Sequence, residues 1–257
     1  MQKKSISTQP FPHAQISWPV QNVQAFTSLR NFEDCNQHAW KKYQTFNLGL
    51  HVGDDPQSVN LNRTLLAENL PQNTKIQWLD QVHGSTVAHI KQCSESPIVA
   101  DAAFTDEKGI ALAVMTADCL PILLSSIDGK YVAAIHGGWR CLAGNIIDNT
   151  VSLFPEPSSI VAWLGPCVGP TAFEVGEDVR EAFTSSSALF EKAFLPHSVS
   201  DNKYFADLHQ IARAQLAQLG VKQVYSKPDC TFSEPSLYFS YRRDGQTGRM
   251  ATVICRY

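Results

Sequence analysis

Three apolar segments in the middle of the chain constrain the fold more than any other feature. Residues 110–115, 120–125 and 131–135 are short, apolar runs of the kind that form buried strands. Asp128-Gly129, between the second and third runs, is a strong hairpin-turn signal. Gly137-Gly138 then ends the third strand, and residues 141–153 have helical spacing. This region therefore predicts a buried sheet that contains an antiparallel hairpin.

The elements on either side mix strands with helices. Further strands are predicted at residues 75–79, 160–164, 237–241 and 250–257, the last two joined around Asp244-Gly245. Helices are predicted at residues 60–70, 177–183 and 208–219, with Asp207 and Gly220 capping the last of these. This order favours an α+β fold: a single layered domain over residues 1–257, with mixed, largely antiparallel sheets flanked by helices. We expect residues 1–15 to be a loose N-terminal extension.

Composition and charge exclude several classes of protein. The chain has 257 residues, of which 44% are hydrophobic and 18% charged, which is an ordinary globular profile. A net charge of -3 and a pI of about 6.2 do not suggest a nucleic-acid or membrane-surface partner. We find neither a secretory signal nor an apolar run that approaches the ~18 residues of a membrane span. Seven cysteines with irregular spacing then indicate reduced thiols in a cytoplasmic protein.

His83, Cys119 and His136 are the residues that point most directly to chemistry. Each lies at a predicted strand end or turn, beside Gly or Pro. Two imidazoles and one thiolate are good zinc ligands, and three protein ligands leave one position open for water or substrate. The long separations between them match no local metal-binding motif, and each residue alone also fits an ordinary loop or core role.

The same residues allow other chemistries. Cys119 and His136 could form a thiolate–imidazole pair for covalent catalysis. Sulfur and imidazole also suit copper, with Met115 as the nearby axial candidate, although eight mostly scattered histidines do not suit a multi-copper cluster. Asp118 could orient a metal ligand, act as a base, or only form a turn.

Arginines form a second group of candidate binding residues. Arg140 follows His136 in the first turn of a predicted helix, where phosphate and carboxylate groups are favoured. The others are Arg30, Arg63, Arg242, Arg243 and Arg249. Arginines are most often at the surface or ion-paired, so each also has an ordinary interpretation. The glycine-rich turns lack the spacing of a nucleotide-binding loop.

Nine motifs, taken as an ordered set, resemble one family. They are Asn47-Leu-Gly-Leu-His-Val-Gly-Asp-Asp, Gln81-Val-His-Gly, Asp101-Ala-Ala-Phe-Thr, Thr116-Ala-Asp-Cys-Leu-Pro, His136-Gly-Gly-Trp-Arg, Trp163-Leu-Gly-Pro-Cys, Phe173-Glu-Val-Gly, Ser240-Tyr-Arg-Arg-Asp-Gly and Thr247-Gly-Arg. From about residue 25 onwards the chain resembles the laccase-domain or polyphenol-oxidase-like family. This family is also called the peptidoglycan editing factor family, and the purine nucleoside phosphorylase family with adenosine deaminase activity.

The resemblance implies a layered α+β domain related to a toxin-type cysteine deamidase, with one zinc on His83, Cys119 and His136. It implies phosphorolysis of adenosine, inosine, guanosine and methylthioadenosine to base and ribose-1-phosphate (or its methylthio form), and deamination of adenosine. Catalytic roles are expected for Cys119, His136 and Asp118, and substrate or phosphate contacts for Arg30, Asn47 and Arg140. The expected partners are a nucleoside and phosphate, for a monomer or homodimer with no nucleic-acid or membrane partner.

Two departures from the family pattern concern substrate preference. The segment Thr27-Ser-Leu-Arg-Asn-Phe keeps the family's arginine, Arg30, but lacks the two glycines that usually follow it, and Cys141 stands where a glycine is common. The expected zinc ligands are intact. The alternatives are a cysteine hydrolase or amidase that edits peptidoglycan precursors through Cys119 and His136, a copper-dependent polyphenol oxidase, and a non-catalytic metal- or nucleoside-binding module.

Overall fold

Most strands belong to two large sheets. The structure, a computed structural model, describes residues 11–31, 43, 45–197 and 200–257. A five-stranded sheet has the order β1 (His13–Gln15), β2 (Val23–Ser28), β16 (Met250–Arg256), β8 (Ile110–Thr116), β3 (Lys75–Gln77). A six-stranded sheet has the order β15 (Gln223–Ser226), β11 (Ile160–Leu164), β9 (Leu120–Ser126), β10 (Val132–Gly137), β7 (Ala102–Thr105), β5 (Val87–His89). The β3–β8, β11–β15 and β5–β7 pairs are parallel, and the other pairs in these sheets are antiparallel.

Smaller sheets and helices complete the fold. β12 (Glu174–Gly176), β14 (Lys203–Ala206) and β13 (Phe194–Pro196) form one small sheet, and β4 (Leu79–Asp80) pairs with β6 (Ile98–Val99). The helices are α1 (Pro56–Ala67), α2 (Trp139–Ala143), α3 (Ile146–Val151), α4 (Glu177–Thr184), α5 (Leu208–Gln218) and α6 (Tyr241–Asp244), with 3-10 turns η1 (Pro157–Ser159) and η2 (Ala188–Ala193). Within the described residues, no helix combines the length and apolar character needed to cross a bilayer.

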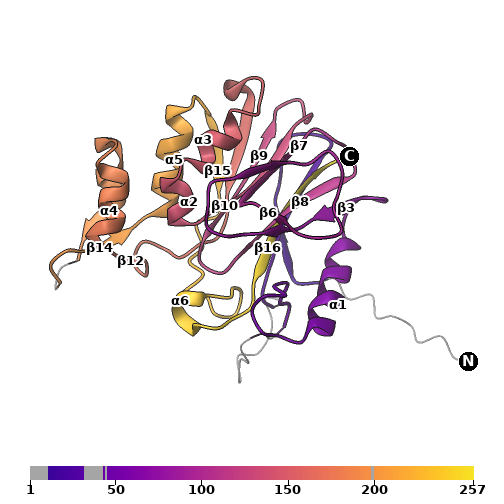
Figure 1. Cartoon of the computed structure of the whole chain (residues 1–257), viewed down its shortest axis with the longest axis horizontal. Coiled ribbons are helices and arrows are strands. Elements are labelled where there is room, and N and C mark those ends of the chain that lie inside the picture. Colours follow the sequence, from indigo (N-terminus) through magenta and orange to yellow (C-terminus); the bar gives the residue numbers. More distant parts are fainter. Residues whose placement is uncertain (1–10, 32–42, 44, 198–199) are drawn as a thin grey trace, which may run out of the picture.

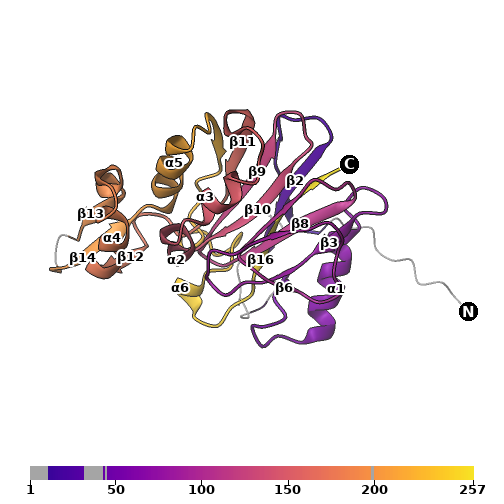
Figure 2. The same cartoon turned by 45° about the horizontal axis from the view of Figure 1, so that its top comes forward.

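The sheets and helices form layers around apolar cores. Leu112 and Val114 of β8 pack with Leu123 of β9 and Ile254 of β16 between the two large sheets. Helices α2, α3 and α5 pack on the other face of the six-stranded sheet. Helix α1 lies on the opposite side of the molecule (Figure 1), and the small sheet with α4 stands at one end (Figure 2). Because β8 and β9 are covered on both faces, their sequences are mostly continuous apolar runs instead of alternating.

The predicted fold class is confirmed. The three central apolar runs form β8, β9 and β10, and Gly129 takes a positive φ of 68° in the β9–β10 hairpin. Helix α5 begins as predicted, because the carboxylate of Asp207 accepts a hydrogen bond from the N–H of Gln210 at 3.0 Å. Gly220, with φ at 82°, follows the end of this helix.

Two predicted elements are wrong. Residues 237–241 do not form a strand, since Arg243 donates to the carbonyls of Thr231, Phe232 and Tyr238, and these bonds hold the segment as a coil that leads into α6. Strand β16 therefore pairs with β2 and β8 instead of forming a hairpin around residues 244–245. The helix predicted at 141–153 is two helices, because Asn145 has a left-handed φ of 64° between α2 and α3.

The boundaries near the N-terminal side also differ from the predictions. The helix predicted at 60–70 begins at Pro56, where the Asp55 side chain accepts hydrogen bonds from the N–H groups of Gln57 and Ser58. His13–Gln15 form β1 and pair with β2, so these residues of the expected loose extension belong to a sheet. Residues 1–10 lie outside the described residues, as does the segment directly after Arg30 and Asn31 that lacks the family's glycines.

Candidate metal centre

The strand register brings His83, Cys119 and His136 together. β8 and β9 belong to different large sheets, and Cys119 lies in the short connection between them. In the antiparallel β9–β10 pair, Gly137 lies opposite Leu120, so the end of β10 carries His136 next to the start of β9. His83 lies in the loop after β4. One ligand atom from each of the three side chains lies within 4.8 Å of the others, which is close enough for one metal ion.

A buried carboxylate, Asp101, holds two of the three residues in position. Its oxygens accept hydrogen bonds from the N–H groups of Val82, His83 and Gly84 at 3.2, 2.9 and 2.7 Å. The same side chain accepts a hydrogen bond from His136 Nδ1 at 2.8 Å. Nε2 of His136 is therefore the nitrogen left for a metal, and a carboxylate bound in this way fixes the orientation of a ligating ring.

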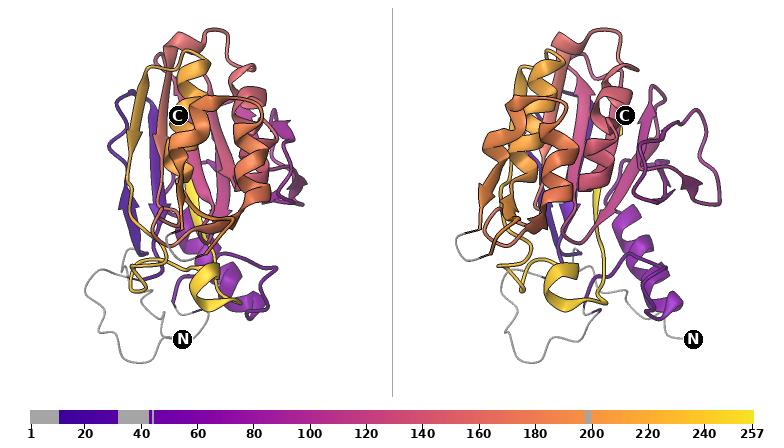
Figure 3. Two further views of the ribbon diagram at one scale, coloured as in Figure 1. Left: turned by 90° about the vertical axis from the view of Figure 1, so that its left-hand side faces the viewer. Right: turned by 60° about the vertical axis from the view of Figure 1, so that its left-hand side comes forward.

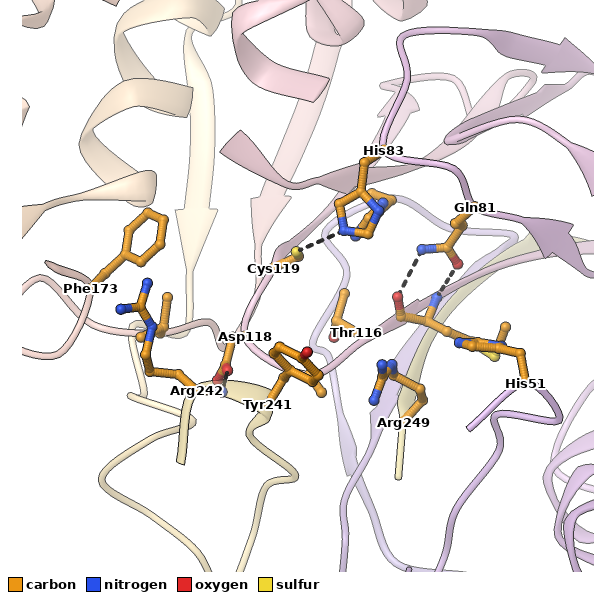
Figure 4. A pocket seen from close by; sticks show the side chains of 14 residues that line it. His51, Gln81, His83, Thr116, Asp118, Cys119, Phe173, Tyr241, Arg242 and Arg249 are labelled. Carbon is orange, nitrogen blue, oxygen red and sulfur yellow. Dashed lines mark hydrogen bonds between the residues drawn. The ribbon is translucent and has the colours of Figure 1, made fainter. Parts of the chain in front are cut away.

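The backbone at the site depends on close packing. His83 has a positive φ of 60°, which the three bonds from its loop to Asp101 stabilise. A Cβ at Gly138 would lie 3.2 Å from Cδ2 of His83 and 3.3 Å from Sγ of Cys119. Glycine at position 138 therefore lets the start of α2 approach the candidate ligands. Figure 4 shows Cys119 and His83 next to each other.

The electrostatics of the three residues favour a bound cation. Burial raises the pKa of the Cys119 thiol, but the charges of and hydrogen bonds to His136 and His83 outweigh this effect and give a pKa of about 6. Burial lowers the pKa of His136, whereas the Cys119 thiolate and Asp101 raise it well above its ordinary value. A thiol or an imidazolium ring must lose its proton before it can bind a metal ion. A bound cation therefore takes the place of the proton shared by Cys119 and His136. The donor set of one thiolate and two imidazole nitrogens fits a metal ion with an open position.

A second group of potential metal ligands overlaps the first. Asp101, His136 and Cys141 also lie within reach of one another, but Asp101 and His136 are already joined by their hydrogen bond. Because His136 belongs to both groups, the described residues do not supply two independent centres of this kind. Met115, the candidate axial ligand in the copper alternative, accepts a hydrogen bond from Arg63 at its sulfur, 3.6 Å away.

A cavity of about 410 Å³ adjoins the three candidate ligands. Figure 4 shows the side chains that project towards it from several elements. Gln81 holds one wall in place, because its amide accepts from Met115 N–H at 2.7 Å and donates to Met115 C=O at 2.8 Å. Helices α1 and α6 lie at the same end of the large sheets (Figure 3). Besides the three ligands, the lining is His51, Gln81, Met115, Thr116, Ala117, Asp118, Val168, Phe173, Tyr241, Arg242 and Arg249.

Asp118 lines the cavity, but both of its carboxylate oxygens are bound to protein groups. Oδ1 accepts a hydrogen bond from the Thr231 hydroxyl at 2.7 Å, and Oδ2 accepts one from the N–H of Arg242 at 2.6 Å. Its φ of 97° lies in a strained region for a residue with a side chain. These bonds attach the β8–β9 connection to the start of α6, whereas Asp101 is the carboxylate that orients His136.

The three predicted substrate contacts lie outside the cavity lining. Arg30 is buried, packs over the Phe239 ring at 5.0 Å and lies 3.7 Å from Asp244. Arg140 is exposed, with its guanidinium 4.3 Å from the centre of the Trp139 ring. Asn47 is buried, and its Oδ1 accepts hydrogen bonds from the N–H groups of Gly49 and Arg249, both at 2.9 Å. Asn47 thus positions Arg249, which does line the cavity.

Several residues of the site carry no signal of a function in the sequence itself. Asp101, His51 and Gln81 each lie inside one of the motifs that carry the family resemblance. Their partners are far away in the sequence, such as Gln81 with Met115 and Asp101 with His136. The motifs marked these residues as notable, but only the folded chain shows what each one contacts.

The fold and site are those of an α+β protein with a candidate metal centre beside a small-molecule cavity. The family model described as "Multi-copper polyphenol oxidoreductase laccase" matches residues 35–257, so the chain belongs to this family, which confirms the predicted resemblance. That family name suggests metal binding, and the candidate ligand set agrees with it.

Relatives with curated names point to an enzyme. The chain is 47% identical over 215 residues to "Purine nucleoside phosphorylase YfiH" of Escherichia coli, an alignment that covers 82% of this chain and 86% of the relative. It is 43% identical over 242 residues to the "Purine nucleoside phosphorylase" of Haemophilus influenzae, covering 93% and 96% of the two chains. The crystal structure of Neisseria meningitidis protein NMB0706 has a TM-score of 0.87 and 38% identity, covering 95% of this chain and 98% of that one. These likenesses support a nucleoside phosphorylase role and a small-molecule substrate.

Proposed function

We propose that the protein is a zinc-dependent enzyme that splits purine nucleosides with phosphate. The observation that carries this proposal is the meeting of three ligand atoms, from His83, Cys119 and His136, in the wall of one cavity. A volume of about 410 Å³ lies within the usual range for small-molecule sites, which is roughly 300–1,000 Å³. The names of the relatives from Escherichia coli and Haemophilus influenzae supply the reaction class.

The reaction is a group transfer at the sugar. An oxygen of hydrogen phosphate forms a bond to the anomeric carbon while the bond from that carbon to the purine ring nitrogen breaks. The electron pair of the broken bond leaves with the base, and the proton of hydrogen phosphate ends on the base. The products are a free purine and ribose-1-phosphate, so no oxidant or further reactant is needed.

The residues of the chain supply orientation and charge for this step. Zinc bound by His83, Cys119 and His136 would supply a Lewis acid at one end of the cavity. Asp101 holds His136 and the His83 loop, and Gln81 fixes the end of β8. Phe173 and Tyr241 offer aromatic faces for a purine ring. Holding both reactants in one cavity replaces an encounter in solution by an oriented reaction, which is a large source of rate enhancement.

The proposal extends to the finer activities that the resemblance implies. These are phosphorolysis of adenosine, inosine, guanosine and methylthioadenosine, and deamination of adenosine. A cavity with one carboxylate and two arginines in its lining suits neutral nucleosides together with an anionic co-substrate. Both activities would share the three ligands, because a Lewis acid assists either reaction.

A cysteine hydrolase is the second candidate, and one observation favours it. Cys119, His136 and Asp101 form a chain from thiol to imidazole to carboxylate, the arrangement that activates a cysteine nucleophile. His83 distinguishes the two proposals, because its Nε2 lies 3.9 Å from the sulfur of Cys119. A second imidazole at this distance would hinder the approach of a substrate to a nucleophilic sulfur, whereas it suits a shared metal ion.

The direct test is to incubate the zinc-loaded protein with inosine, with and without phosphate, and to identify the products. The proposal predicts hypoxanthine and ribose-1-phosphate only when phosphate is present. Free ribose formed without phosphate would indicate a hydrolase and contradict the proposal. A stable thioester trapped on Cys119 from an amide substrate would favour the cysteine hydrolase instead.

A further inference from the structure

The cavity beside the candidate ligands carries positive charge that nearby carboxylates do not neutralise. Arg242 and Arg249 line the cavity, and neither forms an ion pair with any residue in the described part of the chain. Asp118, the carboxylate in the same lining, is already bound by Thr231 and by the backbone of Arg242. An anionic ligand would balance this charge.

Arg249 is held so that part of its guanidinium stays available. Its Nη1 donates to the carbonyls of Thr247 and Gly248, at 2.9 and 3.0 Å, whereas Nε and Nη2 donate to no group among the described residues. Gly49 makes room for the side chain, because a Cβ there would lie 2.9 Å from Cγ of Arg249. Figure 4 shows the guanidinium pointing upward into the cavity, on the same side as His51. The guanidinium group, held in place through Nη1, therefore presents Nε and Nη2 to the cavity as free hydrogen-bond donors.

Thr116 supplies a second, independent observation. Its side chain lines the cavity and the residue is only 2% exposed, yet its hydroxyl has no hydrogen-bond partner in the described ranges. Because the residue is buried but its hydroxyl oxygen still reaches the cavity surface, the hydroxyl is available to a ligand or water in the cavity. Thr116 ends β8 and lies opposite Met250, the residue that follows Arg249. The sheet register thus brings the hydroxyl and the guanidinium to the same end of the sheet.

His51 adds a third polar group at this end of the cavity. Partial burial, followed by the charges of Arg249 and Arg63, lowers the pKa of the His51 ring. A neutral His51 ring can donate one hydrogen bond to a ligand, and it adds no repulsion to the positive charges of Arg249 and Arg63. Arg63 itself contacts Met115, and its donors are turned to Leu48 and Met115 instead of to the cavity.

We propose that Arg249 and Thr116, assisted by His51, form a phosphate subsite whose ligand is inorganic phosphate. The inference rests on the proposed phosphorolysis, and it assigns the phosphate to residues other than Arg30 and Arg140. A guanidinium fork and a hydroxyl match the geometry and charge of phosphate oxygens. The nucleoside would then lie between this subsite and His83, Cys119 and His136, so that phosphate meets the sugar inside the cavity.

The test compares Arg249→Gln and Thr116→Val with Arg213→Gln, each as the full zinc-loaded chain. Arg213 is a matched control, because it is an exposed arginine on α5 that bonds to Val224 and Ser226 outside the cavity. We expect Arg249→Gln to raise the KM for phosphate and the Kd for phosphate by about tenfold or more, with the KM for inosine within about twofold. Thr116→Val should raise both phosphate constants by about threefold to tenfold, and the control should change neither.

The possible outcomes separate this inference from the proposed function. Phosphate binding that depends on Arg249, in a protein that cleaves no nucleoside, would support the subsite and reject the phosphorylase. Unchanged phosphate constants in both Arg249→Gln and Thr116→Val would overturn the subsite while leaving the phosphorylase intact. Arg249-dependent binding of inosine 5′-monophosphate, without binding of inorganic phosphate, would also overturn it. Thr116→Val replaces the hydroxyl with a methyl group of similar size, so it keeps the test valid if Arg249→Gln does not fold.

Discussion

Replacing Asp101 by Asn tests whether one carboxylate organises the whole site. Asp101 accepts four hydrogen bonds from nitrogen donors, two on each oxygen: from His83 N–H and His136 Nδ1, and from Val82 N–H and Gly84 N–H. The Cys141 thiol adds a longer contact to the first of these oxygens. Asn has one acceptor oxygen, so in either orientation its NH₂ group faces two donors. Hydrogen bonds to charged groups contribute about 1.5–3 kcal/mol each, so two lost bonds should cost about 3–6 kcal/mol.

The effect should appear in two assays. Urea unfolding in the presence of a chelator should show the full loss, which is a large part of the ~5–15 kcal/mol that stabilises a typical protein. Zinc affinity, measured by competition with a chromophoric chelator, should fall by about 10–100-fold because His136 and His83 lose their orientation. The control is Asp106→Asn, which removes the same charge from a partly exposed carboxylate bound to Lys91 and His89 and should cost less than about 1 kcal/mol.

The pH dependence provides an internal check on the Asp101 prediction. Burial opposes ionisation of Asp101, but the bonds from His136, Gly84 and His83 lower its pKa overall. A lowered folded-state pKa stabilises the protein above the unfolded-state pKa of about 3.9, and this stabilisation disappears as the pH falls through the folded-state value. The difference between wild type and Asp101→Asn should therefore shrink below about pH 4. Equal unfolding midpoints and equal zinc affinities at pH 7 would refute the reasoning.

Two further predictions concern the packing and the protection of the site. Gly138→Ala should weaken zinc binding by about tenfold or more, because the added Cβ would press on His83 and Cys119. The control is Gly84→Ala, whose Cβ would make only ordinary contacts. Equal zinc titrations for the two variants would contradict this prediction. After chelation at pH 7.5, iodoacetamide should label Cys119, whose pKa is about 6, and spare Cys255, whose pKa burial raises to about 12. Added zinc should protect Cys119 in peptide mass spectra, and labelling unaffected by zinc would argue against a metal on this sulfur.

The sequence predicts the central strands well because burial leaves a local signal. β8, β9 and β10 are buried along their whole length and mostly apolar, and Asp128-Gly129 marks the hairpin between the last two. Cys119 and His136 could therefore each be placed at a predicted strand end or turn, whereas their meeting with His83 is a finding of the structure.

The errors arise where long-range side-chain contacts decide the backbone. Residues 237–241 have strand-forming side chains, but the guanidinium of Arg243 binds three carbonyls of this region and holds it outside the sheets. Asp101 has no local signal of its role, since it meets His136 only through the β7–β10 pairing that sets Ala102 opposite Ile135. Arg30 matches the family pattern in sequence, yet burial against Phe239 keeps it out of the cavity lining.

The most direct test of the central claim is the metal content of the purified wild type and His83→Ala, measured alongside phosphate-dependent cleavage of inosine. His89→Ala is the control, because His89 is an exposed histidine on β5 that bonds to Asp106 away from the cavity. We expect about one zinc per chain in wild type and His89→Ala, and loss of both zinc and cleavage in His83→Ala. Full zinc content and unchanged cleavage in His83→Ala would contradict it.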